Sequence, residues 1–146
     1  INVRVKGGAY GVMNGAGRFG DSYFVSYRDP NLRETNEVYE GIVPYLEQFE
    51  ADERDMTKFV IGTISDLDAP LLPPYKGADA AWFTGVTDAM IQKERDEILA
   101  VTPEDIRELA PIIRAVLSEQ SICAIGNAEK VKANQDLFKT VKNLFN

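Results

Sequence analysis

The chain has 146 residues, about the length of one ordinary domain, and is 45% hydrophobic and 27% charged, as folded globular proteins are. Its net charge of -7 argues against nucleic-acid binding, and no apolar run approaches the roughly 20 residues that span a membrane. The absence of histidine excludes histidine-based zinc sites and Ser-His-Asp or Cys-His catalytic groups from this chain. We therefore expect no nucleic-acid partner, no membrane partner and no metal bound by these residues.

The first part of the chain predicts a β-hairpin. Residues 10–14 form the first expected strand, and residues 22–27 alternate Tyr23, Val25 and Tyr27 with Phe24 and Ser26. The stretch between them, GAGRFG at residues 15–20, matches the dinucleotide-binding pattern G-x-G-x-x-G. That pattern requires a helix after it, and a strand follows here, so we interpret it as a hairpin turn.

A helix is expected after residues 28–31. Asp29 is placed to cap it, Pro30 suits the first helical position, and an apolar stripe follows at three- and four-residue steps. Gly41 and Pro44 are expected to weaken or kink this helix.

Further helix starts are predicted at Asp52, Thr87 and Thr102, the last followed by Pro103 and by Asp105 in a capping-box position. A proline-rich connector at residues 69–74 and a short helix at residues 76–83, with Trp82 inward, lie between the first two. Pro111 is expected to kink the last of these helices.

An apolar strand at residues 121–125 and a final helix complete the pattern. The lone Cys123 excludes an internal disulfide, and its apolar neighbours predict a buried free thiol, which favours an intracellular compartment. The order of elements predicts a single α+β domain over residues 1–146, with an antiparallel sheet and helices packed on one face. About three strands make a small sheet, so we expect a fragment that is incomplete at its N-terminus.

Two groups of residues are candidates for chemistry. The acid clusters, Asp52, Glu53 and Asp55 together with Asp66 and Asp68, lie at expected helix ends, where capping is their simplest role. Arg4 and Tyr10 can donate hydrogen bonds to a carbonyl or an oxyanion, and Gly7 and Gly8 between them permit a sharp bend and close approach of another chain. Residue types alone leave open a surface arginine, a core tyrosine and a plain glycine turn.

Two motifs carry a resemblance to a known family. The stretch RVKGGAYG at residues 4–11 and SYRDPNL at residues 26–32, supported by KGA at 76–78, GVT at 85–87 and ERDEIL at 94–99, resembles the second half of presequence proteases. These belong to the insulinase-like (pitrilysin) zinc metallopeptidases. The resemblance covers essentially the whole chain.

The resemblance implies a two-half zinc endopeptidase that degrades unfolded peptides. The N-terminal half of such enzymes binds zinc through His-x-x-Glu-His, and the C-terminal half lacks zinc and closes the chamber. Arg4 and Tyr10 match the family's R-x5-Y segment, which implies that Arg4 holds the substrate backbone and that Tyr10 donates to the oxyanion. The expected partners are a peptide substrate and the zinc-bearing half, and the fragment alone is expected to be inactive. A non-catalytic homologue, such as a processing-peptidase-like subunit or a respiratory-complex core subunit, stays open.

Overall fold

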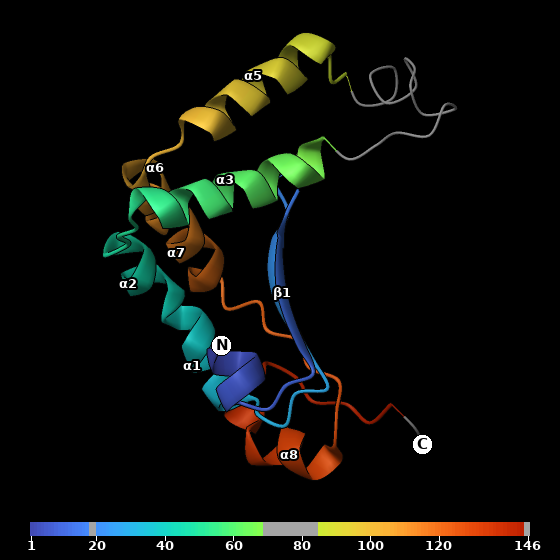
Figure 1. The fold of residues 1–146 in the computed structure, drawn as a ribbon. Helices are drawn as coiled ribbons and strands as arrows, with labels where there is room; N and C mark the ends of the chain where they lie inside the picture. Colours follow the sequence, from blue (N-terminus) through green and yellow to red (C-terminus); the bar gives the residue numbers. More distant parts are fainter. Residues whose placement is uncertain (18–19, 69–84, 145–146) are drawn as a thin grey trace. The chain divides into compact units, whose positions relative to one another are not determined.

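The computed structural model describes residues 1–17, 20–68 and 85–144 (Figure 1). The fold class is α+β, as predicted. The described part contains one two-stranded antiparallel sheet and several helices. The chain divides into two compact units, one made of Ile1–Glu47 with Leu109–Asn146 and the other of Gln48–Glu108. The assignment of all 146 residues to one domain stays a prediction. The expected connector at residues 69–74 and the expected helix at residues 76–83, with Trp82, lie outside the described residues.

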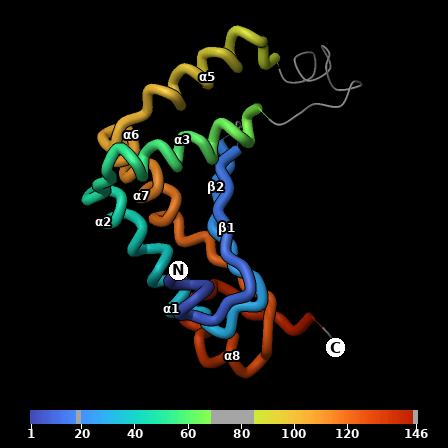
Figure 2. Tube along the Cα trace, viewed as in Figure 1, coloured from blue at the N-terminus to red at the C-terminus, as the bar shows by residue number. Residues whose placement is uncertain are grey.

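The hairpin of the first unit consists of β1 (Gly11–Ala16) and β2 (Ser22–Tyr27), which Figure 2 shows coiled about each other. Exposure alternates along β2, with Tyr23, Val25 and Tyr27 on the exposed face, which confirms the predicted alternation. Gly11 lies opposite Tyr27 and Gly15 lies opposite Tyr23. A Cβ on Gly15 would lie 2.5 Å from the end of the Tyr23 ring, so a larger residue there would require this exposed ring to move. The G-x-G-x-x-G pattern therefore belongs to a hairpin.

Helices of the first unit pack on one face of this hairpin. The unit contains a short π-helical turn, η1 (Asn2–Lys6), and the elements α1 (Arg33–Glu40), α2 (Ile42–Glu47), α7 (Ala110–Ser118), α8 (Ala128–Ala133) and η3 (Gln135–Leu137). The α2 helix packs against α7, and η1 contacts both α1 and β1. Gly41 separates α1 from α2, as its low helix propensity predicted.

The second unit contains α3 (Glu53–Leu67), α5 (Asp88–Ala100) and α6 (Pro103–Arg107). All three predicted caps are confirmed, because Asp52, Thr87 and Thr102 each accept a hydrogen bond from the backbone N–H three residues later. Thr102 and Asp105 form the predicted capping box. The α3 and α5 helices contact each other and run antiparallel (Figure 1). In the described ranges, no helix has both the length and the apolar character needed to cross a membrane.

The first helix begins later than predicted. It starts at Arg33, and its N-cap residue, Leu32, makes no side-chain cap bond. The Asp29 carboxylate accepts instead from the Asn31 N–H at 2.9 Å and from the Thr35 hydroxyl at 2.7 Å. The prediction that Asp29 caps a helix starting at Pro30 is therefore wrong, because this carboxylate closes a turn around Pro30.

Two expectations for the last third of the chain are also wrong. Residues 121–125 form no strand, since the ladder bonds of the described part all join β1 to β2. Without a neighbouring strand this segment stays open to solvent, so Cys123 is exposed rather than buried and Ile125 is 81% exposed. Pro111 has a stronger effect than a kink: α6 ends at Arg107 and α7 begins at Ala110, as the missing N–H and bulky ring of proline dictate.

Candidate active site

The candidate catalytic pair flanks a backbone turn in the first unit. Arg4 lies in η1 and Tyr10 lies directly before β1. Between them the Gly8 N–H donates to the Arg4 carbonyl at 3.1 Å, and Gly8 has a φ of +80°, a left-handed conformation that favours glycine. The chain thus passes from a helical turn to a strand within four residues.

Gly7 is required for a different reason. Its φ of -81° is ordinary, but a Cβ there would lie 2.6 Å from the carbonyl oxygen of Val3, inside the preceding turn. The two glycines therefore have separate functions: Gly7 allows tight closure of η1, and Gly8 reverses the backbone. The sharp bend predicted for this pair is present in the structure.

The turn exposes one side chain at each end. Arg4 is exposed, and Tyr10 is 68% exposed, whereas Ala9 beside it is only 4% exposed. The Tyr10 N–H donates to the Tyr27 carbonyl at 3.2 Å, which fixes the tyrosine backbone to the end of β2. Within the described residues no hydrogen bond or ring contact joins the Arg4 and Tyr10 side chains, so the structure places both at one turn but does not pair them.

The two motifs behind the family resemblance meet at this turn. The Asn31 side-chain amide donates to the Gly7 carbonyl at 2.6 Å, although the two residues are 24 positions apart. The Asn31 N–H donates in turn to Asp29, whose other carboxylate oxygen accepts from the hydroxyl of Thr35. Thr35 is only 6% exposed, so this series of bonds connects the turn to a buried position on α1.

Arg28 is a site residue that the sequence analysis missed. Its guanidinium carbon lies 5.7 Å from the centre of the Tyr10 ring and 5.4 Å from that of Tyr27, and the two rings meet edge to face at 6.0 Å. These distances are in the range of cation–π attraction. Arg28 also has a φ of +48°, which is unusual for a residue other than glycine. The available signal was its position inside SYRDPNL, a motif that we interpreted as a strand-to-helix junction only.

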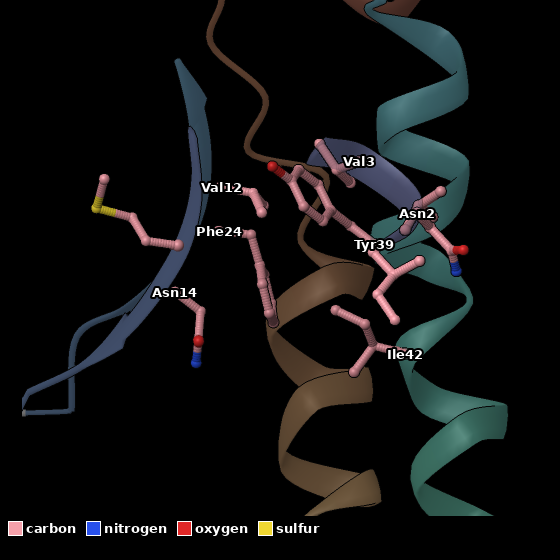
Figure 3. A pocket seen from close by; sticks show the side chains of 10 residues that line it. Asn2, Val3, Val12, Asn14, Phe24, Tyr39 and Ile42 are labelled. Carbon is pink, nitrogen blue, oxygen red and sulfur yellow. The ribbon is translucent and has the colours of Figure 1, made fainter. Parts of the chain in front are cut away.

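An apolar pocket lies between the hairpin and the helices of this unit (Figure 3). The Phe24 ring stacks on Tyr39 with centres 5.4 Å apart, and Val12 and Ile42 also line the pocket. Burial raises the pKa of the Tyr39 phenol, an effect that the Ser26 side chain partly offsets, so this phenol is protonated at neutral pH. The side chains that line the pocket hold the hairpin against α1, the helix that carries Thr35.

The described residues do not form a zinc site. Histidine is absent from the whole sequence, and among residues 1–17, 20–68 and 85–144 no three carboxylate or thiol side chains gather closely enough to hold a metal ion. The acid pairs singled out in the sequence have other contacts: Asp52 caps α3, Asp55 pairs with Lys58 and Asp68 pairs with Arg95. What this site offers is a phenol, two guanidinium groups and a rigid turn, which suit binding and hydrogen-bond donation to a polar chain.

The α+β order of elements and the position of Arg4 and Tyr10 at one turn are compatible with the resemblance to presequence proteases. The family model described as PreP C-terminal domain matches residues 1–137. The chain belongs to this presequence protease family, and the resemblance is confirmed.

Relatives from bacteria, plants and fungi agree with this assignment. "Protein HypA" of Clostridium perfringens is 48% identical over 144 residues, which cover 97% of this chain and 15% of the relative. Presequence protease 1, chloroplastic/mitochondrial, of Arabidopsis thaliana is 37% identical over 90% of this chain and 12% of its own length. The mitochondrial presequence protease of Aspergillus fumigatus is 34% identical over 85% of this chain, again 12% of its own length. The chain spans less than a sixth of the length of these relatives.

Proposed function

We propose that this chain serves as the non-zinc C-terminal domain of a zinc metalloendopeptidase that degrades unfolded peptides. The observation that carries the proposal is the 2.6 Å hydrogen bond from Asn31 to the Gly7 carbonyl, because it joins the two family motifs into one rigid turn. The family match and the relatives named as presequence proteases support the peptidase context. In this proposal the domain closes the chamber, and the peptide substrate and the zinc-bearing half are its partners.

In this proposal Tyr10 acts on the transition state. Hydrolysis of a peptide bond converts the planar carbonyl into a tetrahedral species whose oxygen carries negative charge. A phenol O–H can donate a hydrogen bond to that oxygen. The exposed position of Tyr10 leaves its hydroxyl accessible to a substrate.

In this proposal Arg4 binds the peptide substrate both before the reaction and in the transition state. Its guanidinium carries five N–H donors in a planar fork, which suits the carbonyl groups of an extended peptide or a terminal carboxylate. Since η1 fixes the Arg4 backbone, the side chain reaches a substrate from a defined origin. Zinc, which the family implies, would activate the attacking water from the other half of the protein.

The test is the substitution Tyr10→Phe in the full-length protein that carries this chain. Loss of one oxyanion donor is expected to lower kcat on an unstructured fluorogenic peptide by about 10- to 1000-fold, with a small change in KM. The matched control is Tyr23→Phe, which removes the hydroxyl of another exposed tyrosine on the same hairpin. This control is expected to leave kcat unchanged.

Two outcomes contradict the proposal. Near-normal turnover of Tyr10→Phe would remove the catalytic role of that phenol. Absence of peptide cleavage by the zinc-loaded, unsubstituted full-length protein would instead favour a non-catalytic subunit of the same fold.

A further inference from the structure

The junction between β2 and α1 contacts the middle and the end of the Arg4–Tyr10 segment. Asn31 holds the carbonyl of Gly7, in the middle of the segment, and Arg28 packs against the Tyr10 ring at its end. No other described side chain makes a hydrogen bond to the backbone of residues 4–10. The junction therefore supplies the side-chain hydrogen bond to the turn, beside the backbone bonds from Ala9 to Val3 and from Tyr10 to Tyr27.

The junction is itself held by hydrogen bonds that connect it to α1. The Asp29 carboxylate bridges the Asn31 backbone N–H and the Thr35 hydroxyl, which ties the Asn31 backbone to α1. Thr35 is buried, so its hydroxyl is a fixed point on α1. A Cβ built on Gly8 would lie 3.7 Å from the γ-carbon of Pro30, so the proline ring lies beside the turn.

We propose that the junction residues Arg28, Asp29 and Asn31 are positioning residues for Arg4 and Tyr10. This inference extends the proposed function. Only its expected effect on kcat rests on that function. Asn31 fixes the turn through the Gly7 carbonyl, and Arg28 fixes the Tyr10 ring. The unusual backbone of Arg28 fits this role, because strained residues of this kind concentrate where geometry matters for function.

The first experiment measures the turn directly and does not depend on activity. In the full-length protein, Asn31→Ala is expected to speed amide hydrogen exchange of residues 7–10 by about 5- to 10-fold, the loss of one hydrogen bond. The matched control is Asn36→Ala, which removes an asparagine bond to Glu40 on α1 without touching the turn. Equal exchange of residues 7–10 in the two variants would overturn the positioning inference, whatever Tyr10 does.

The second experiment asks whether Asn31 acts through Tyr10. Because small displacements of a reacting group are costly, Asn31→Ala is expected to lower kcat by about 5- to 50-fold, and by less than about 2-fold when Tyr10→Phe is already present. Equal losses in both backgrounds would show that Asn31 supports general stability only. Full turnover of Tyr10→Phe would refute the proposed function, while the hydrogen-exchange result would still decide the positioning role.

Two milder changes keep the test valid should Asn31→Ala fold poorly. Thr35→Val removes the hydroxyl bond to Asp29, whereas Thr35→Ser keeps it. Arg28→Asn removes the guanidinium but keeps a residue that tolerates a positive φ. We expect Thr35→Val and Arg28→Asn each to lower kcat by about 3- to 10-fold, with Thr35→Ser near the unsubstituted value. Equal rates for Thr35→Val and Thr35→Ser would overturn the connection from α1 to the turn.

Discussion

The two compact units of the chain differ in how their backbone turns are fixed. In the unit Gln48–Glu108 each described helix begins with a side-chain cap that reaches three residues along the chain. In the other unit, the turn that carries the candidate site is held by Asn31 from 24 positions away. The same unit has bonds of still longer reach, from Lys130 to Pro30 and from Arg33 to Asp136.

The helix starts of the second unit thus depend on neighbouring residues, whereas the candidate turn depends on a residue that is distant in the sequence. A capped helix start tolerates changes elsewhere, because the bond that defines it lies within one helical turn. The candidate site depends on the packing of η1, β2 and α1, so a change in any of these elements alters the direction of Arg4 and Tyr10. Changes at the candidate turn should therefore spread further than the loss of a helix cap in the second unit.

The largest expected difference lies between two glycine-to-alanine substitutions, one in the candidate turn and one in α3. Gly7→Ala places a Cβ 2.6 Å from the Val3 carbonyl and should destabilise the turn by about 1–3 kcal/mol. Gly62→Ala in α3 meets nothing within 4 Å and should stabilise that helix by up to about 1 kcal/mol. Hydrogen exchange of residues 7–10 and of α3 measures both. Destabilisation of equal size at the two glycines would contradict the comparison.

Removing a cap should have an effect of intermediate size that stays local. Thr102→Ala breaks the capping box of α6 and is expected to cost about 1 kcal/mol, seen as faster exchange of the Asp105 and Ile106 amides. Thr57→Ala, within α3, provides the control, since the Thr57 hydroxyl bonds only to the carbonyl of Glu53 in its own helix. Faster exchange at residues 7–10 in Thr102→Ala would contradict the expectation that the effect of this cap stays local.

The exposed ion pair between Arg33 and Asp136 should have the smallest effect, and one that depends on pH. The hydrogen bond from Arg33 lowers the pKa of the Asp136 carboxyl, so its stabilising effect is complete above the unfolded value near 4 and is lost as pH falls through the lowered folded value. Protection of the Leu137 and Phe138 amides should therefore fall faster between about pH 5 and pH 2 than in Asp136→Asn. The same pH dependence in both proteins would rule out this pair as the cause.

Sequence patterns predicted the features whose causes are local. The caps at Asp52, Thr87 and Thr102 and the alternating faces of β2 follow from residues within a few positions of each other, and the structure confirms them. The glycine bend next to Tyr10 was also predictable, since few other residues adopt its backbone.

Features that depend on distant partners were predicted wrongly or missed. Residues 121–125 have the composition of a strand but no neighbouring strand in the described part of the chain, and the predicted burial of Cys123 failed for that reason. Asp29 was assigned to a helix cap because the pattern does not show that Asn31 and Thr35 compete for it. The position of Arg28 inside SYRDPNL marked it in the sequence, but its contact with Tyr10 and Tyr27 depends on their proximity in space, which the motif does not show.

The passage from η1 into β1 also limits how the chain can tolerate insertions and deletions. Ala9 points inward at 4% exposure and Tyr10 outward at 68%, and successive residues of an extended chain face opposite sides. We therefore expect that one residue added or removed between Gly8 and Gly11 would turn the tyrosine toward the interior, so that only Arg4 stays exposed at the turn. Length variation in this protein should accumulate in the tip of the hairpin, while the interval from Arg4 to Tyr10 stays constant.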